Sequence, residues 1–251
     1  MLLVIDIGNT HTKIGLWWEG AWLAHWRVVS DATHPSDSYG HDLRGRLAAY
    51  GGKVVVKAVV ASVIPQLQAI WEEVCLSYLG VKPLLVSAAT VPQYPVLTDN
   101  PAGVGADRIA NVAGAYAYYR GPSIVIDMGT ATTFDVVSAE GALLGGVIAP
   151  GLELITAALA RQAAQLREVP LEAPARAIGK NTTEAVQSGL IFGYVGLVEG
   201  MVVRLKREWG AEGIKVLGTG GLVGKIGPHT AVFDDILPLL TVDGLRVIAE
   251  L

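Results

Sequence analysis

Apolar and polar residues alternate along this chain with two different periods, and the order of the periods is the same in each half. The first half opens with three strand-like runs separated by short polar turns, a pattern typical of an antiparallel meander. Helical spacing follows, and a proline- and glycine-rich stretch at residues 91–105 predicts a long functional loop. The predicted strands of this half are residues 2–5, 12–18, 22–28, 53–62 and 84–86, and the predicted helices are residues 36–50, 65–79 and 107–119.

The second half restarts the same order of elements after residues 120–122, which include a glycine and a proline. An asparagine at 181 with a glutamate three residues later indicates a capping box that opens a long helix. A meander followed by alternating helices and strands, occurring twice, predicts an α/β fold of two duplicated lobes, at residues 1–119 and 120–251. The predicted strands here are residues 124–126, 132–137, 143–148 and 215–217, and the predicted helices are residues 152–166, 181–208 and 222–226.

One polar glycine turn occurs in both halves. Asp6-Ile7-Gly8-Asn9-Thr10 follows the first strand of the chain, and Asp127-Met128-Gly129-Thr130-Ala131 follows the corresponding strand of the second half. A Glu-Gly-Ala bend comes after each turn at the same spacing, at Glu19 and Glu140. Glycine lets a backbone approach a ligand closely, and successive N–H groups in such a turn can cradle a phosphate. Two turns of one kind therefore indicate one shared ligand.

The first turn carries the groups that phosphate binding needs. Thr10 supplies a hydroxyl donor, Lys13 supplies a positive charge, and Asp6 can organise a cation or a water molecule beside the phosphate. The alternative is an ordinary hairpin turn, in which aspartate and asparagine bond their own backbone. The second copy of the turn favours the ligand over this alternative.

Two further motifs are candidates for chemistry. Gly105-Ala106-Asp107-Arg108 ends the long loop, and an acid beside an arginine suits proton abstraction and anion capture. The alternative is that Asp107 only caps the helix that follows it. Gly218-Thr219-Gly220-Gly221 lies between a strand and a helix, which suits the sugar or base of a nucleotide or, equally, a plain structural turn.

Composition narrows the classes of function. The 251 residues are 51% hydrophobic and 17% charged, so a large core is expected, and the net charge of −4 argues against a general nucleic-acid binder. The single cysteine, Cys75, allows no internal disulfide and belongs to no zinc motif, and its neighbours at helical spacing indicate a buried thiol. No signal peptide is evident, and the apolar stretch at residues 189–203 is short and contains Glu199, so we expect no membrane span and a cytoplasmic location.

Taken together and in order, the motifs of this chain resemble those of the type III pantothenate kinases. The resemblance covers roughly residues 2–245, and the ordered set is far more specific than any one motif. It implies the actin-like fold shared by acetate kinase, sugar kinases and Hsp70, with ribonuclease H-like lobes, a mixed sheet in each lobe and a nucleotide cleft between them. It also implies ATP-dependent phosphorylation of pantothenate, the first step of coenzyme A synthesis. The motifs are Asp6-Ile7-Gly8-Asn9-Thr10, residues 105–108, residues 127–133, residues 145–151, Gly179-Lys180-Asn181-Thr182 and Thr219-Gly220-Gly221.

The resemblance also implies roles for individual residues. Asp107 would accept the proton of the pantothenate hydroxyl, and Asp127 would bind a monovalent cation, K⁺ or NH₄⁺. A divalent cation, Mg²⁺ by expectation, would accompany ATP. The ATP phosphates would contact Asp6, Ile7, Gly8, Asn9, Thr10, His11, Thr12 and Lys13, together with Thr130, and pantothenate would contact Gly105, Ala106, Asp107, Arg108 and Thr182.

One position departs from the family pattern, because Thr98 stands where many members have a tyrosine. The aromatic wall of the substrate pocket is therefore absent or comes from elsewhere, and Tyr94 is near but at another position. Two alternatives to a pantothenate kinase stay open: a kinase of another small alcohol, and an ATP-binding regulatory module without transferase activity.

Assembly is indicated by a stripe of small residues on the long helix. Gly189, Gly193, Gly196 and Gly200 recur every three or four residues, beside the bulkier Leu190, Tyr194, Leu197 and Met201. The stripe fits either close packing within the lobe or a helix-to-helix contact between two copies. The resemblance favours a homodimer, in which the same patch meets itself.

Overall fold

The computed structural model describes residues 1–162 and 169–251. The chain forms two compact units. The first contains Met1–Tyr119, Gly141–Leu143 and Leu240–Leu251, and the second contains Arg120–Glu140 and Leu144–Leu239. The chain leaves the first unit at the predicted boundary near Arg120, but its last residues return to the first unit.

The first unit is built on a five-stranded mixed sheet with the strand order β3-β2-β1-β4-β5. The predicted meander is confirmed, since β1 pairs antiparallel with β2 and β2 with β3, whereas β4 joins β1 in parallel. Strand β1 is buried along its whole length because it lies in the middle of this sheet. The strands are β1 (Leu2–Ile7), β2 (His11–Trp18), β3 (Ala21–Val29), β4 (Lys57–Ser62) and β5 (Leu84–Leu85).

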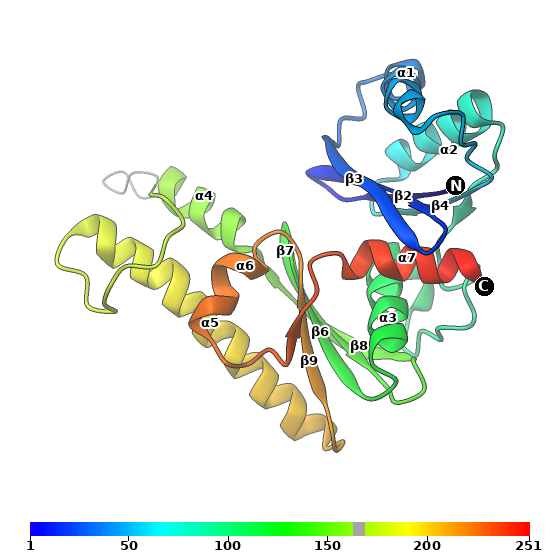
Figure 1. The fold of residues 1–251 in the computed structure, drawn as a ribbon. Coiled ribbons are helices and arrows are strands. Elements are labelled where there is room, and N and C mark those ends of the chain that lie inside the picture. Colours follow the sequence, from blue (N-terminus) through cyan, green and yellow to red (C-terminus); the bar gives the residue numbers. More distant parts are fainter. Residues whose placement is uncertain (163–168) are drawn as a thin grey trace. The chain divides into compact units, whose positions relative to one another are not determined.

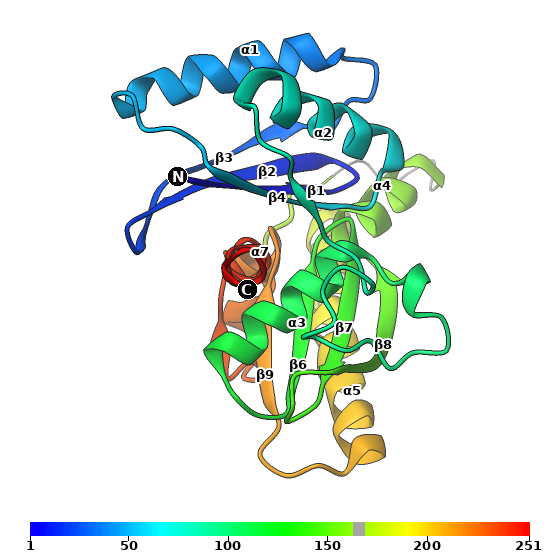
Figure 2. The same cartoon turned by 90° about the vertical axis from the view of Figure 1, so that its right-hand side faces the viewer.

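Helices cover both faces of this sheet. Figure 2 shows α1 and α2 on one face and α3 and α7 on the other. The core between the sheet and α2 contains Trp71, Leu67 and Val74, which lie at helical spacing. The helices of this unit are α1 (Ser36–Leu47), α2 (Pro65–Leu79), α3 (Ala106–Tyr118) and α7 (Leu240–Glu250), with short 3₁₀ turns at Ala48–Tyr50 and Pro101–Gly103.

The C-terminal helix α7 packs closely against α3. Gly114 and Gly244 allow the two backbones to touch, since a Cβ at Gly244 would lie 1.8 Å from the carbonyl oxygen of Ala110. Beside them the buried hydroxyl of Thr241 donates to the side-chain oxygen of Asn111 at 2.8 Å. These contacts place residues 240–251 in the first unit, whereas the division from sequence assigned them to the second lobe.

The second unit repeats the plan with the strand order β10-β9-β6-β7-β8. Its core lies between the sheet and the long helix α5, which Figure 1 shows running beside β6 and β9, with α4 and α6 next to it. The strands are β6 (Ser123–Met128), β7 (Ala131–Val137), β8 (Leu143–Pro150), β9 (Lys215–Thr219) and β10 (Asp235–Ile236), and the helices are α4 (Leu152–Gln162), α5 (Thr182–Trp209), α6 (Val223–Ile226) and a 3₁₀ turn at Gly227–His229.

Most predicted elements are found within a few residues of their expected bounds. The strand expected at residues 53–62 is shorter, because Val54 and Val56 are exposed and only Lys57–Ser62 pairs with the sheet. Residues 163–166 of the helix expected at 152–166 lie outside the described part of the chain. Helix α7 and strand β10 were not predicted.

Helix α5 begins and ends at the residues that its caps dictate. The side chain of Asn181 accepts a hydrogen bond from the N–H of Glu184 at 2.9 Å, which confirms the expected N-cap, and Gly210 ends the helix in the left-handed conformation. Helix α5 has 28 residues, and an 18-residue window within it has a mean hydropathy of 1.5, so it would be able to cross a membrane by length and composition alone. That evidence is weak, because the core helix of a soluble protein passes the same test, and one face of α5 packs into the core of this unit.

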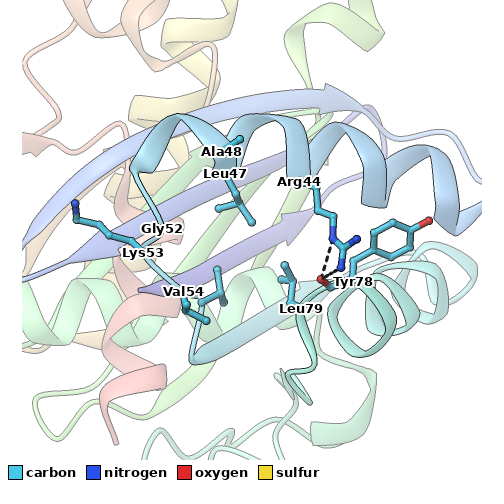
Figure 3. A pocket seen from close by; sticks show the side chains of 9 residues that line it. Arg44, Leu47, Ala48, Gly52, Lys53, Val54, Tyr78 and Leu79 are labelled. Atoms are coloured by element: carbon cyan, nitrogen blue, oxygen red, sulfur yellow. Dashed lines mark hydrogen bonds between the residues drawn. The ribbon is translucent and has the colours of Figure 1, made fainter.

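The outer side of the first unit has a pocket between α1 and the chain before β4. Its volume is about 320 Å³, and its floor is apolar, with Leu47, Val55 and Leu79. Figure 3 shows Arg44 at one end, where its guanidinium donates to the carbonyl oxygen of Tyr78 at 3.1 and 3.2 Å. This cavity contains none of the predicted site residues.

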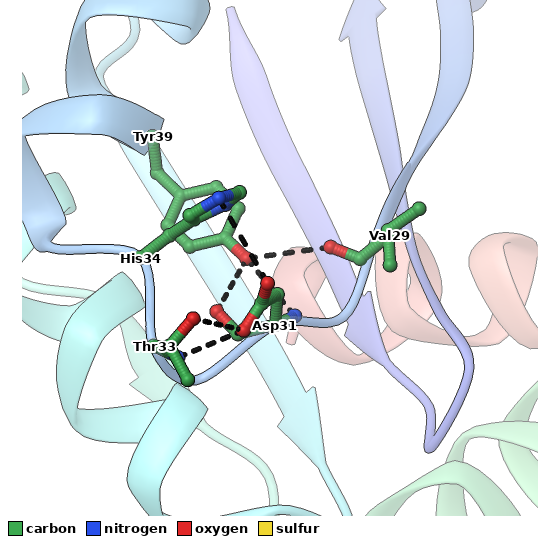
Figure 4. Close-up of polar contacts among 5 residues, drawn as sticks. All are labelled: Val29, Asp31, Thr33, His34 and Tyr39. Carbon is green, nitrogen blue, oxygen red and sulfur yellow. Dashed lines mark hydrogen bonds and ion pairs between the residues drawn. The ribbon is translucent and has the colours of Figure 1, made fainter.

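The loop between β3 and α1 is held by Tyr39. Its hydroxyl donates to the carbonyl oxygen of Asp31 at 2.9 Å and accepts from the N–H of the same residue at 3.1 Å (Figure 4). The carboxylate of Asp31 accepts from the hydroxyl and the N–H of Thr33, and these bonds lower the pKa of Asp31. The network stabilises the loop conformation.

The buried thiol of Cys75 gives a simple prediction. Burial, with Glu72 nearby, raises the pKa of Cys75 to about 12, so the reactive thiolate is scarce at neutral pH. We expect a thiol reagent at pH 8 to leave the native protein unlabelled and to modify Cys75 rapidly in guanidinium chloride. Fast labelling of the native protein would contradict the buried position.

Candidate active site

The first turn follows β1 and is organised by an ion pair across the β1–β2 hairpin. Asp6 is 4% exposed and is the register partner of Lys13 on β2. The ammonium group of Lys13 donates to the carboxylate of Asp6 at 3.0 Å. The turn itself is closed by a hydrogen bond from the N–H of Gly8 to the carbonyl oxygen of His11 at 3.1 Å.

The side chains of this first turn point in two directions. Ile7 lies in the core of the first unit, and the hydroxyl of Thr12 is buried against that of Ser30 at 3.0 Å. Asn9, Thr10 and His11 are exposed at the tip of the hairpin. Ile7 and Thr12, whose side chains are buried, can offer a ligand only their backbone. The residues at the tip can offer both N–H groups and side chains.

The second turn has the same place in its own sheet but is one residue shorter. Three residues, Gly129 to Ala131, separate the paired residues Met128 and Thr132, whereas four, residues 8–11, separate the paired residues Ile7 and Thr12. The N–H of Gly129 donates to the carbonyl oxygen of Ala131 at 3.0 Å, and Thr130 is exposed at the tip. The register partner of Asp127 is therefore the residue six positions on, Thr133, whereas that of Asp6 is the residue seven positions on, Lys13.

Asp127 is flanked by threonines on both neighbouring strands. Its register partners are Thr133 on β7 and Thr219 on β9, so the three side chains lie on one face of the sheet. The hydroxyls of both threonines are buried and make no hydrogen bond within the described part of the chain. The carboxylate and the two hydroxyls are hard oxygen donors, the kind of ligand that hard cations take.

The third glycine motif lies directly against this row. Gly220 has a positive φ of 91°, and a Cβ there would lie 2.5 Å from a carboxylate oxygen of Asp127. The N–H of Leu222 donates to the carbonyl oxygen of Met128 at 3.1 Å. Only glycine fits at position 220, so this motif and the second turn form one structural feature of the second unit.

Asp107 lies in the first turn of α3 and does not cap it. The N-cap is Gly105, which makes no side-chain cap hydrogen bond, so the capping alternative is wrong. The carboxylate of Asp107 accepts from the N–H of Arg108 at 2.9 Å and folds back over Gly105, where a Cβ would lie 2.4 Å from it. Ala106 is buried beneath, and Asp107 and Arg108 are half-buried at the start of the helix.

The remaining predicted residues lie in separate places. Thr182 is exposed in the first turn of α5, immediately after the Asn181 cap. Thr98 has a buried hydroxyl without a hydrogen bond among the described residues. Tyr94 is buried and packs edge-to-face on Tyr116, with 6.3 Å between the ring centroids. Its ring therefore belongs to the core of the first unit.

Comparison with known proteins decides the family. The family model described as type III pantothenate kinase matches residues 2–204. The chain belongs to the type III pantothenate kinase family. It is 44% identical over 253 residues to the type III pantothenate kinase of Moorella thermoacetica, covering 100% of this chain and 99% of the relative. It is 43% identical over 263 residues to that of Koribacter versatilis, covering 100% and 95%.

Solved structures agree on the fold. A structure described as a Baf family transcriptional activator from Campylobacter jejuni matches with a TM-score of 0.63 at 18% identity, covering 99% of this chain and 97% of the other. A polyphosphate/ATP-glucomannokinase from Arthrobacter matches with a TM-score of 0.52 at 17% identity, covering 99% and 98%. The expected actin-like α/β fold with a mixed sheet in each half is confirmed.

Two features of the site were missed from sequence. Thr133 was part of a quoted motif but received no role, because its place beside Asp127 depends on the β6–β7 register. Tyr194 was interpreted only as a bulky helix residue, yet its hydroxyl is hydrogen-bonded to Thr132 at the base of the second turn. The sequence did hold a signal for Tyr194, because a tyrosine on an apolar helix face buries a hydroxyl that needs a hydrogen-bond partner.

Proposed function

We propose that this chain transfers the γ-phosphoryl group of ATP to the primary hydroxyl of pantothenate, the first step of coenzyme A biosynthesis. The observation that carries the proposal is the family match over residues 2–204, which contains both glycine turns, the Gly105–Arg108 motif and Thr182. Phosphoryl transfer depends mainly on positioning and charge neutralisation, and the site residues offer both.

The two turns bind the phosphates of ATP in this proposal. Residues 6–13 offer the N–H groups at the hairpin tip and the charge of Lys13, which the carboxylate of Asp6 holds in place at 3.0 Å. Thr130 offers the hydroxyl of the second turn. The matching positions of the turns at the ends of β1 and β6 support a shared ligand.

Asp107 and Arg108 handle pantothenate. The carboxylate of Asp107 accepts the proton of the attacking hydroxyl, since an alcohol is a poor nucleophile until its proton is accepted. Arg108 binds the carboxylate of pantothenate through a charge-assisted hydrogen bond, and Thr182 adds a further polar contact. The position of Asp107 inside the helix, rather than at its cap, supports a role beyond helix initiation.

Asp127 holds a monovalent cation, K⁺ or NH₄⁺, in this proposal. The residues fit such an ion, because one carboxylate and the two buried threonine hydroxyls of Thr133 and Thr219 supply oxygen ligands on one face. The cation supplies positive charge beside the incoming phosphate. Among the described residues no cluster of three or more His, Cys, Asp or Glu could hold a metal ion, so we expect Mg²⁺ to arrive with ATP.

The test of the function is ADP release with and without pantothenate, measured over a panel of alcohols. We expect release to depend on pantothenate and to be weak with neutral sugars, which lack a carboxylate for Arg108. Equal turnover with other alcohols would assign the chain to another substrate. ATP binding without any turnover would instead support a regulatory module.

We predict that activity depends on K⁺ and that Asp127→Ala abolishes this dependence. Thr219→Val removes one proposed ligand and should raise the K⁺ concentration needed for half-maximal activity, by about tenfold if one good contact of roughly 1.4 kcal/mol is lost. The measurement is a K⁺ titration at constant ionic strength with Na⁺ as the replacement. Equal activity of the wild type in Na⁺ and K⁺ would refute the cation site.

We further propose that two copies associate through α5. Gly189, Gly193, Gly196 and Gly200 are all exposed, and a Cβ built at any of them meets no atom within 4 Å among the described residues, apart from the helix's own nearby backbone. Of the neighbouring bulky residues, Leu190 and Tyr194 are buried in the core of the second unit, and Leu197 and Met201 pack partly against it. The bulky ridge therefore serves the core, and the open glycine stripe is the surface that can meet a second copy.

Gly196→Leu tests this contact. The side chain enters open space and replaces glycine in a helix, so the isolated fold should gain about 0.5–1 kcal/mol, while close approach of a second helix is blocked. We expect a folded monomer by light scattering where the wild type is a dimer. Gly45→Leu makes the same change at an open position of α1 and should leave the dimer intact. A monomeric, active wild type would refute the proposal.

The location and remaining partners follow the family. We propose a cytoplasmic enzyme that binds neither nucleic acid nor membrane. The net charge of −4 supports the first point, and the burial of one face of α5 in the core supports the second.

A further inference from the structure

A chain of hydrogen bonds connects α5 to the second turn. Tyr194 is 4% exposed on the core-facing side of α5. Its hydroxyl is hydrogen-bonded to the hydroxyl of Thr132 and donates to the carbonyl oxygen of Pro150 at 3.3 Å. A phenol has one proton, so the hydroxyl of Thr132 donates to Tyr194 when Tyr194 donates to Pro150. The chain therefore runs from Thr132 through Tyr194 to Pro150.

Both ends of this chain adjoin the turn that contains Thr130. Thr132 is fully buried and directly follows the turn. Pro150 directly precedes Gly151, whose N–H donates to the carbonyl oxygen of Thr130 at 3.2 Å. A Cβ at Gly151 would lie 2.2 Å from that same oxygen, so the two backbone segments are in contact. The turn is held from one side through Thr132 and from the other through Gly151.

We propose that Tyr194 is a positioning residue for the second turn, and that its hydroxyl sets the geometry in which Thr130 and the turn N–H groups bind ATP phosphates. The inference rests on the phosphate-binding role proposed for Thr130. Burial raises the pKa of the Tyr194 phenol, although the hydrogen bond from Thr132 lowers it, so the phenol keeps its proton at neutral pH and remains a donor.

Tyr194→Phe isolates the hydroxyl because the ring and its core packing are kept. Pro150 and Thr132 both lose the phenol as a partner, so the link between them is broken, while the hydrogen bond from Gly151 to Thr130 remains. We expect the KM for ATP to rise about three- to tenfold with a lower kcat, while the KM for pantothenate stays within about twofold of the wild type. A role in stability alone would not separate the two substrates in this way.

The experiment compares Tyr194→Phe and four further variants with the wild type. Thr132→Val removes the other hydroxyl and should reproduce Tyr194→Phe, whereas Thr132→Ser keeps the hydroxyl and should restore the wild-type KM. The double variant Tyr194→Phe/Thr132→Val should be no worse than either single variant, because both break one chain. Tyr78→Phe removes a tyrosine hydroxyl that donates to Asp37 in the first unit and should change neither KM. Binding of a non-hydrolysable ATP analogue, measured by calorimetry without pantothenate, gives a second readout.

The outcomes separate the possibilities. A lower melting temperature with unchanged KM and analogue affinity would overturn the inference, and so would equal increases in the KM of both substrates. If Tyr194→Phe does not fold, Thr132→Val against Thr132→Ser decides the question. A wild type without pantothenate-dependent ADP release would refute the proposed function alone, because the analogue affinities still test Tyr194.

Discussion

Asp107→Asn is expected to lower pantothenate-dependent turnover by about 10²–10⁴, the usual effect of losing a general base. Asparagine keeps the shape of the side chain, and its oxygen can still accept the hydrogen bond that the carboxylate receives from the N–H of Arg108 at 2.9 Å. The start of α3 should therefore be preserved while the basic group is lost. The measurement is kcat by coupled ADP release, with the fold checked by circular dichroism.

Asp42→Asn is the matched control for this change. Asp42 lies on α1 and pairs with Arg46 at 2.8 Å on the surface, so its neutralisation removes a carboxylate without touching the proposed site. We expect wild-type kcat for this variant. Near-wild-type turnover by a folded Asp107→Asn protein would remove Asp107 from the role of proton acceptor.

Gly244→Ala is expected to produce the largest loss of stability among single-methyl changes. The new Cβ would lie 1.8 Å from the carbonyl oxygen of Ala110 and 2.9 Å from the backbone nitrogen of Gly114, and backbone atoms cannot rotate away. Overpacking costs typically 1–3 kcal/mol, and we expect about 3 kcal/mol here. For a chain of this size that corresponds to a melting temperature lower by about 6–12 °C.

The control for Gly244→Ala is the same substitution in an open helix position. In the part of the chain that the structure describes, a Cβ at Gly45 on α1 would meet no atom within 4 Å outside the nearby helix backbone, so Gly45→Ala should stabilise the protein by about 0.5–1 kcal/mol through helix propensity. Opposite shifts of the two melting temperatures in differential scanning calorimetry would confirm the close α3–α7 contact. A neutral Gly244→Ala would show that the two helices can move apart without cost.

Asp107→Asn and Gly244→Ala both affect helix α3. Helix α3 carries Asp107 at its start, and its middle is fixed against α7 by the glycine contact and by the buried bond between Thr241 and Asn111. Loss of the α7 contact should therefore reduce activity as well as stability. The C-terminal helix, which sequence patterns did not reveal, supports the residue proposed to act on the substrate.

The local elements were predictable from sequence because their signals are short-range. The alternation of apolar residues placed β1 to β3 within a few residues, proline at 65 placed the start of α2, and Asn181 with Glu184 placed the start of α5. The duplicated turn was also readable, because Asp, Gly and their flanking strands recur at the same spacing. Each of these features depends on residues that are neighbours in the chain.

The tertiary structure decided which residues surround each aspartate. Asp6 faces Lys13 across its hairpin, whereas the second turn is one residue shorter and Asp127 faces threonines on both sides. That difference depends on strand register, and a shift of one residue in register changes every cross-strand partner. The pairing of Thr219 with Asp127 also requires β9 to join β6 across a long stretch of chain, which no local pattern encodes.

By itself, the sequence determined the α/β class, the duplicated halves, the two turns and, through the ordered motifs, the family. It did not determine that residues 240–251 join the first unit, that Asp107 lies inside its helix instead of capping it, or that Tyr194 holds the second turn. The physical reason is the range of the interactions. Propensity, capping and periodicity act over a few residues, whereas glycine-mediated backbone contacts and buried hydroxyl pairs join segments that meet only when the chain has folded.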